Sequence, residues 1–351
     1  MTLAAFLRLL KGRSSAVPVA KYPLILGIAA TACVNSFFAT LEAPVRRRAM
    51  RRLSSPSRPV VIIGFWRSGT TMLHELLSRD PQFVAPTTLQ CFFPESFGAA
   101  RALSFLIRPL LPGSRPMDAV RLAPGTPQED EFAILNMGMP SPLRVFAFPS
   151  LFEAGPGAAA VHPGNVDARW LRRWSSFLSA VQAGNAGGRL LLKSSGHTFR
   201  MTEIRSLYPD AVFIHLARRP EQQIASAVKM FHAMAQTQSL EADLPPLEVI
   251  AEFVLTMHER MYDAFFEAAA SLEEDRLVCL RYEDLVADPA GQAQKAYRQL
   301  GIDGYDRLKS ALPRGGDDGN AHPVDRYAIS SAFQAEIRRR TERYRAAFGY
   351  E

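Results

Sequence analysis

The sequence contains few cysteines and no recognisable metal-binding pattern. Cys33, Cys91 and Cys279 are the three cysteines in 351 residues. Their odd number and wide spacing indicate free thiols in a reducing compartment instead of a disulfide framework. No group of histidine, cysteine and acidic residues has the spacing of metal ligands, so the sequence predicts no metal centre.

Basic repeats interleaved with aromatic residues are missing too, and there is no helix–turn–helix signal. These absences argue against nucleic acid as a partner. The chain is nevertheless basic, with a formal net charge of +7 and a pI near 9.5. That charge suits an anionic nucleotide or an anionic lipid surface. The length allows one large α/β domain or two small ones.

One loop has the glycine spacing of a phosphate-binding loop but lacks its lysine. Residues 60–63 form a short β-branched run, which predicts a buried strand, and the leucine spacing farther on predicts a helix. Gly64 and Gly69, which lie between this strand and this helix, have the spacing of a Walker A loop. Two threonines follow Gly69 where a nucleoside triphosphatase has lysine and serine or threonine, and Arg67 is the nearby cation. This loop is better suited to hold a 5′-anion such as a phosphosulfate than to transfer a γ-phosphoryl group.

The segment Gly64-Phe65-Trp66-Arg67-Ser68-Gly69-Thr70-Thr71 resembles the 5′-phosphosulfate loop of sulfotransferases that use 3′-phosphoadenosine-5′-phosphosulfate (PAPS). The resemblance extends over about residues 58–348. It implies an α/β fold, a P-loop-like three-layer sandwich whose central parallel sheet is flanked by helices, and a reaction that requires no metal. It also implies that the loop and the first helical turn bind PAPS, through Arg67, Ser68, Gly69, Thr70, Thr71 and Met72.

A second pair of anion-binding residues follows another strand, predicted over residues 212–217. Arg218 and Ser226 lie eight residues apart at the junction of this strand and a helix, and we expect them to converge on one anion. They resemble the 3′-phosphate motif of the same family, in its two fixed places.

Two later segments extend the resemblance. Residues 281–285, Arg-Tyr-Glu-Asp-Leu, resemble the signature that closes the nucleotide site. Tyr282 is expected on the adenosine side, and Glu283 is expected to cap the following turn. Residues 322–327 resemble a late basic loop over the cofactor, in which Arg326 is a further candidate for the 3′-phosphate.

The general base has two alternative locations. Lys193 and His197 follow a strand predicted over residues 190–193, and chemistry in open α/β sheets sits at the carboxyl ends of strands. They resemble the family's Lys-Ser-Pro-x-His segment, although Ser195 replaces the proline. Cytosolic sulfotransferases carry Lys-x-His at the comparable place, where the histidine is the base. This chain has two more residues between lysine and histidine.

The other alternative is a carboxylate in the segment Thr126-Pro127-Gln128-Glu129-Asp130-Glu131. Thr126 and Glu129 have the spacing of a helix capping box, which would give Glu129 a structural role. Asp130 and Glu131 are not needed for capping. The string resembles the bacterial group of the family, so all three carboxylates are candidates for a catalytic role as base or in binding the acceptor.

The first 55 residues predict a basic and apolar helical segment, followed by the sulfotransferase domain over 56–351. Residues 22–41 carry no charge, and five arginines follow between residues 46 and 52. A helix of that length can cross a bilayer, but we favour one that packs on the domain or lies at a membrane face. Residues 1–52 are then the membrane contact, and the protein is expected in the cytoplasm, peripheral at the inner face of the membrane.

Strands predicted at 60–63, 190–193, 212–217 and 277–281 alternate with helices, which indicates a parallel sheet. With the resemblance, this pattern predicts an enzyme that moves a sulfuryl group from PAPS to a hydroxyl of a small-molecule, phenolic or lipid acceptor. The products would be a sulfate ester and adenosine 3′,5′-bisphosphate. A P-loop kinase and a non-catalytic, nucleotide-binding membrane tether are the alternatives.

Overall fold

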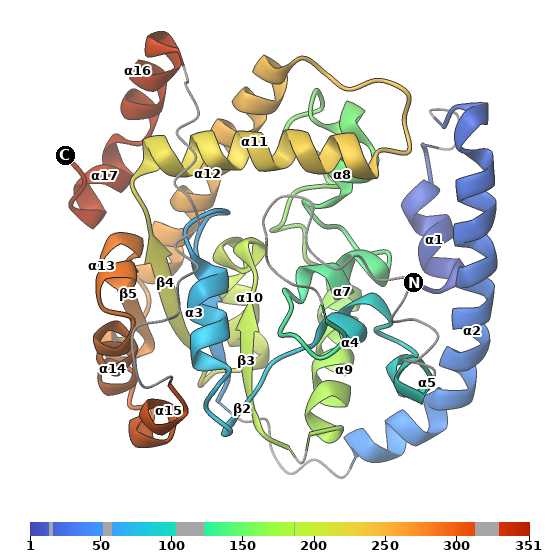
Figure 1. Ribbon diagram of the computed structural model, residues 1–351, viewed down its shortest axis with the longest axis horizontal. Helices are drawn as coiled ribbons and strands as arrows, with labels where there is room; N and C mark the ends of the chain where they lie inside the picture. The colour runs from blue at the N-terminus through green and yellow to red at the C-terminus, as the bar shows by residue number, and fades with distance from the viewer. Residues whose placement is uncertain (14–16, 52–57, 103–122, 186, 313–329) are drawn as a thin grey trace. The chain divides into compact units, whose positions relative to one another are not determined.

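The computed structural model describes residues 1–351 apart from 14–16, 52–57, 103–122, 186 and 313–329 (Figure 1). The chain forms two compact units. Unit 1 consists of Met1–Ser57, Ala85–Leu190 and Met230–Phe253, and unit 2 consists of Arg58–Val84, Leu191–Lys229 and Val254–Glu351. The predicted boundary at residue 55 lies outside the described residues.

A five-stranded sheet forms the centre of unit 2, with the strand order β2-β3-β1-β4-β5 (Figure 1). The pairs β3–β1, β1–β4 and β4–β5 are parallel, which confirms the four predicted strands. β2 is an edge strand of two residues, too short to leave a pattern in the sequence. The strands are β1 (Val60–Ile63), β2 (Phe83–Val84), β3 (Arg189–Lys193), β4 (Val212–Ala217) and β5 (Leu277–Arg281).

Alternate residues of the strands face helices on opposite sides of the sheet. Ile62 and Ile214 lie in a buried core with Leu73 of α3 (Thr70–Leu77). On the other side, the ring of His215 contacts Phe265 and Phe348. Burial on both faces is typical of a parallel sheet and explains why its strands are continuous apolar runs.

The helices of unit 2 follow the strands, as the pattern predicts. At residues 331–348 two helices, α16 and α17, are divided at Thr341. The helical segments are α3 (Thr70–Leu77), η5 (Ser195–Phe199), α10 (Met201–Leu207), η6 (Glu274–Arg276), α13 (Tyr282–Ala287), α14 (Pro289–Gln299), α15 (Tyr305–Ala311), α16 (Ser331–Arg340) and α17 (Glu342–Phe348). Two further helices, α11 (Pro220–Gln238) and α12 (Leu247–Ala269), have residues in both units.

Unit 1 is helical. The predicted apolar helix is present and runs on to Met50, so its arginines at 46–48 continue the same helix. It packs against α1 and α9, and α9 buries an apolar face that includes Trp170 and Trp174. The segments are α1 (Leu3–Leu10), η2 (Val19–Lys21), α2 (Tyr22–Met50), α4 (Thr88–Phe92), α5 (Phe97–Ala102), α7 (Glu131–Asn136), α8 (Arg144–Ala147), η4 (Pro149–Leu151) and α9 (Ala168–Ala183).

Two histidines in the core of unit 2 make folding sensitive to acid. Burial lowers the pKa of His215 and of His258 from 6.5 to about 3. At pH values between about 3 and 6.5, these histidines bind protons in the unfolded chain but not in the folded chain. The free energy of unfolding therefore falls as the pH falls below 6.5. From pH 6.5 to pH 5 the loss is about 2 kcal/mol for each histidine.

We therefore expect His215→Gln to remove about half of this loss of stability between pH 7 and pH 5. The measurement is urea unfolding of both proteins at the two pH values. His232→Gln is the control, since His232 is partly exposed on α11. If the free energy of unfolding of the His215 variant falls between pH 7 and pH 5 as much as that of the unmodified protein, these imidazoles do not control the loss of stability in acid.

Candidate donor-binding and catalytic site

The loop between β1 and α3 curls through three residues with positive φ. These are Gly64 (142°), Arg67 (67°) and Gly69 (91°), and Arg67 is the only such residue other than glycine in the described part of the chain. A side chain held in this conformation stores strain, which clusters at ligand sites. The loop ends at the amino terminus of α3, whose N-cap Gly69 provides no side-chain hydrogen bond. The first N–H groups of that helix are therefore suited to an anion.

Both glycines are required by close approach as well as by φ. A Cβ atom on Gly64 would lie 2.6 Å from the carbonyl oxygen of Leu216, and one on Gly69 would overlap ring atom Cδ2 of Tyr282. The backbone of the loop therefore packs closely against the end of β4 and the start of α13.

Gly69→Ala is expected to lower the free energy of unfolding by about 2–4 kcal/mol, because backbone strain and the overlap with Tyr282 add. Gly301→Ala is the matched control. Its φ is 57°, but the atom nearest to an added Cβ would be 3.8 Å away. Only the cost of the backbone conformation, about 1–2 kcal/mol, therefore applies. Equal losses of the free energy of unfolding in the two variants, measured with urea, would show that the Tyr282 ring moves aside without measurable cost.

The anion-binding residues predicted from two separate motifs come together in unit 2. The Nε atom of Arg67 donates to the hydroxyl of Ser226 at 3.0 Å, and Nη1 of Arg218 donates to the carbonyl oxygen of Arg67 at 2.8 Å. The guanidinium of Arg218 lies 4.3 Å from the ring centroid of Tyr282. Loop, strand end and helix therefore contribute to one cluster, as the motif spacing predicts.

This cluster brings two positive charges together. Burial, and then the neighbouring charge of Arg67, lower the pKa of Arg218, while Tyr282 and Glu283 act in the opposite direction. Side-chain atoms without a partner among the described residues include Nε of Arg218, Oγ of Ser68 and both amide atoms of Gln223. Buried polar groups of this kind are ordinarily satisfied by a ligand or by water. An anion bound here would offset the repulsion and take up the open donors.

The sequence did not reveal the residues that hold Arg218 in place. The hydroxyl of Tyr344 in α17 accepts from the backbone N–H of Arg218 and donates to its carbonyl oxygen, both at 2.9 Å. Glu283 was expected to cap a turn, but it accepts from the backbone N–H of Arg219 and from the hydroxyl of Tyr350. Contacts across 64 to 126 residues leave no periodic signal in the sequence.

Lys193 and His197 also belong to unit 2. Lys193 pairs with Ile62 across β3 and β1, so it ends its strand beside the one that leads into the loop. The loop is tied to the segment of His197 because the N–H of Gly64 donates to the hydroxyl of Thr198 at 3.0 Å. Both predicted side chains are buried.

The contact of His197 with Arg200 bears on its chemistry. Nη1 of Arg200 lies 3.5 Å from Nδ1 of His197. A guanidinium only donates, so this contact makes Nδ1 the acceptor and leaves the proton of a neutral imidazole on Nε2. In that tautomer Nε2 is a hydrogen-bond donor, so a role of His197 as the base requires the other tautomer.

The three carboxylate candidates lie in unit 1. Thr126 does not form the predicted capping box, because its hydroxyl donates to the carbonyl of Ala123 and α7 begins only at Glu131. Glu129 therefore precedes the helix and is free of the capping role. The capping box of this region is formed instead by Thr87 and Gln90, at the start of α4.

Asp130 has a structural partner. It is fully buried and accepts a hydrogen bond of 2.7 Å from Nε1 of Trp174 in α9. Glu131 is also fully buried, and Glu129 is 9% exposed. The remaining predicted site residue, Arg326, lies outside the described residues. Within the described ranges, no group of three His, Cys, Asp or Glu side chains could hold a metal ion.

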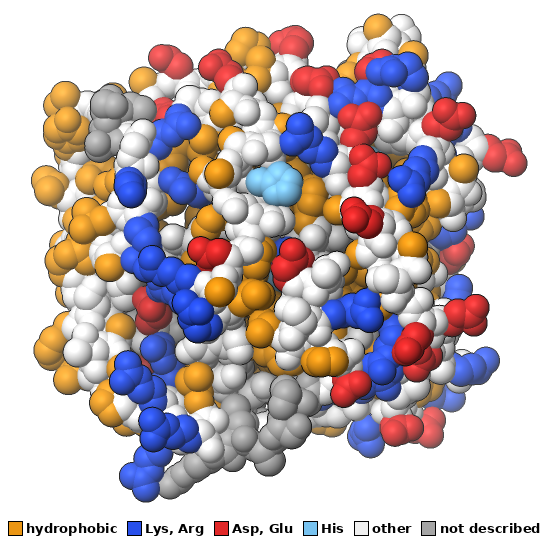
Figure 2. All heavy atoms as spheres, turned by 180° about the vertical axis from the view of Figure 1, so that it is seen from behind, with side chains coloured by type: hydrophobic (Ala, Val, Ile, Leu, Met, Phe, Trp, Pro, Cys, Tyr) orange, Lys and Arg blue, Asp and Glu red, His pale blue; other side chains and the backbone are white. Residues whose placement is uncertain are grey.

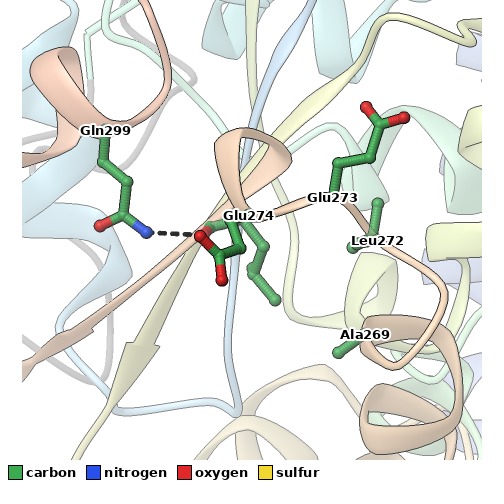
Figure 3. A pocket seen from close by; sticks show the side chains of 6 residues that line it. Ala269, Leu272, Glu273, Glu274 and Gln299 are labelled. Carbon is green, nitrogen blue, oxygen red and sulfur yellow. Dashed lines mark hydrogen bonds between the residues drawn. The ribbon is translucent and has the colours of Figure 1, made fainter.

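A small surface pocket at the other end of the sheet is not suited to an anion. Figure 3 shows it at the amino end of β5, away from the carboxyl end that leads to Tyr282. Gln299 donates there to the carbonyl oxygen of Leu277 at 3.2 Å. Two carboxylates, those of Glu273 and Glu274, line it, and none of its lining residues is basic.

Parallel sheet, glycine loop and clustered arginines define an α/β protein whose loop and strand end are suited to a phosphate-like anion. The model of the sulfotransferase family matches residues 59–307, so the chain belongs to that family. Its relatives include an omega-hydroxy-beta-dihydromenaquinone-9 sulfotransferase of Mycobacterium bovis. That protein is 29% identical over 306 residues, which are 86% of this chain and 78% of the relative. Carbohydrate sulfotransferase 5 of Mus musculus is 24% identical over 270 residues, 69% of this chain and 64% of that protein.

Two solved structures share the fold. Sulfotransferase STF9 from Mycobacterium avium has a TM-score of 0.68 and 18% identity, with coverage of 89% of this chain and 82% of the other. Sulfotransferase STF1 from Mycobacterium tuberculosis H37Rv has a TM-score of 0.64 and 19% identity, with coverage of 98% and 91%. The predicted α/β sulfotransferase fold is thereby confirmed.

Proposed function

We propose that this sulfotransferase uses PAPS as its donor and transfers the sulfuryl group to a hydroxyl of an apolar small molecule or lipid. The cluster of Arg67, Arg218 and Ser226 is the observation that carries the proposal. It offers two guanidinium groups and a hydroxyl to the anionic groups of one donor, and guanidinium forks match phosphate geometry. A kinase reaction is disfavoured by membership of the family and by Thr70 in place of the P-loop lysine.

The residues present fit the donor. Arg218 and Ser226 would hold its 3′-phosphate, and the residues from Arg67 to Met72 would hold its 5′-phosphosulfate against the start of α3. The ring of Tyr282, already beside Arg218, would lie on the adenosine side. When bound, PAPS supplies an activated sulfuryl group with an anionic leaving group.

The protein groups then have distinct tasks. Lys193 and Arg67 stabilise negative charge that develops near the leaving oxygen. A base removes the proton of the acceptor hydroxyl. The contact with Arg200 favours a donor role for Nε2 of His197, so we propose a carboxylate of the segment 129–131 as the base and a hydrogen-bonding role for His197.

Two observations support the acceptor class. A relative acts on an omega-hydroxy menaquinone derivative, as its name states. In unit 1 the segment after Pro86 contains Phe92, which stacks on Phe132 at 5.9 Å and is 36% exposed. Exposed aromatic side chains near the candidate carboxylates suit an apolar alcohol better than a sugar.

The test is transfer of radiolabelled sulfate from PAPS to three acceptors: a long-chain primary alcohol in detergent, a hydroquinone and a monosaccharide. Sulfation of the alcohol or the hydroquinone is expected. Sulfation of the sugar alone would overturn the acceptor class while leaving the donor intact. Absence of binding to PAPS in calorimetry would overturn the donor itself.

A further inference from the structure

One face of α2 is apolar and open to solvent over most of its length. Leu26, Val34, Phe37, Leu41 and Val45 are 55–71% exposed. Their spacing places them on one side of the helix. From Leu26 to Val45 this apolar stripe is about 29 Å long. An exposed apolar patch of this kind marks an interaction surface.

The stripe has cations at its ends and none in between. Lys21 precedes it, and Arg47 and Arg48 are exposed in the last turn of α2. The single acidic residue of α2, Glu42, is turned away, since it accepts from the backbone N–H groups of Gly98 and Ala99. In Figure 2, hydrophobic side chains gather along the left edge, where α2 lies, with basic side chains below them.

We propose that α2 lies flat on an anionic lipid bilayer, with the apolar stripe among the acyl chains and the arginine end against the headgroups. Burial of apolar side chains, together with the attraction of flanking cations to anionic lipids, holds such a helix at a membrane surface. The protein would then be peripheral at the inner face of the membrane. Lipid binding by α2 needs no substrate and is independent of sulfuryl transfer.

The contacts of α2 within unit 1 argue against a spanning helix. The segment Val19–Met50 is long and apolar enough to cross a bilayer, and 11% of its most apolar window is buried. Its other side, however, is engaged by protein: Ser36 accepts from the N–H of Leu3, and Arg46 donates to the carbonyl of Glu95. Spanning would break these bonds and separate Glu42 from the backbone N–H groups of Gly98 and Ala99.

Charge also argues against a second copy of the chain as the occupant. Two stripes packed in parallel would bring Arg47 and Arg48 against their own copies, and two packed antiparallel would bring them against Lys21. Either arrangement places like charges together. A negatively charged surface complements both ends at once.

The first experiment is cosedimentation with vesicles of phosphatidylglycerol and phosphatidylcholine. Binding is expected to be strong with anionic vesicles and weak with phosphatidylcholine alone. Phe37→Asp combined with Leu41→Asp should abolish it. The matched control, Thr202→Asp with Ser206→Asp on exposed positions of α10, adds the same charge and should leave it largely intact. Arg47→Ala with Arg48→Ala should weaken it about thirtyfold at low salt.

A second measurement locates the helix. A bimane label on the exposed Cys33, within the stripe, should shift to the blue on vesicles and be quenched by nitroxide lipids, in a chain with Cys279→Ser. The same label on Thr202→Cys in a chain with Cys33→Ser and Cys279→Ser should not respond.

Three results would overturn the proposal. One is vesicle binding that survives the aspartate pair on the stripe. Another is resistance of the bound protein to alkaline carbonate, which would indicate a spanning helix. The third is a concentration-dependent dimer, abolished by the same aspartate pair, without any vesicle binding.

Discussion

Arg218→Ala is expected to weaken the binding of adenosine 3′,5′-bisphosphate by about 10²–10³-fold. The variant removes a largely buried guanidinium from the anion site, and loss of one partner of a hydrogen-bonded charge pair costs about 2–5 kcal/mol. It should fold, because Tyr344 bonds the backbone of residue 218 and not its side chain. Isothermal calorimetry provides the measurement.

The neighbouring arginine supplies the control. The guanidinium of Arg219 lies 5.7 Å from the ring centroid of Tyr350, and its backbone N–H bonds Glu283. Arg219→Ala removes the same charge one residue away and should retain nearly full affinity. Arg67→Ala should resemble Arg218→Ala, whereas Ser226→Ala should lose about tenfold, since a neutral hydrogen bond contributes about 1 kcal/mol. Equal losses for Arg218→Ala and Arg219→Ala would show that net charge, not this cluster, controls affinity.

Replacing the catalytic base is expected to lower kcat by about 10²–10⁴-fold without changing affinity for the donor. We expect this result for Glu129→Gln or Glu131→Gln. In His197→Gln the amide can still donate a hydrogen bond, so kcat should fall less than about tenfold. Asp130→Asn should act mainly on stability, because Asp130 is buried against Trp174.

The dependence of kcat on pH separates a base from a positioning residue. Loss of the base should flatten the acidic limb of the profile, whereas His197→Gln should leave that limb in place. If His197→Gln falls as far as the base variants and flattens the limb, His197 is the base, and its contact with Arg200 does not fix the tautomer during turnover.

The parts of this protein that sequence reasoning predicted are those with local patterns. β1 and β4 are uninterrupted apolar runs, and the eight-residue spacing of Arg218 and Ser226 places both at one strand–helix junction. The predictions that failed also have physical reasons. The Thr126 capping box depends on where α7 begins, and Pro127 instead forms an isolated bridge with Thr87, about forty residues away. The hydrogen bonds of Tyr344 to the backbone of Arg218 depend on tertiary contacts that no local propensity encodes.

The measurement that tests the central claim most directly is thermal unfolding with adenosine 3′,5′-bisphosphate and, separately, with ATP and magnesium. A ligand that binds the folded state stabilises it by about 2.7 kcal/mol at a concentration of 100 Kd. The midpoint is expected to rise with the concentration of the bisphosphate, and this rise should be lost in Arg218→Ala. A rise with ATP and magnesium alone would contradict the assignment of the loop and of the Arg67, Arg218 and Ser226 cluster to a PAPS-type donor.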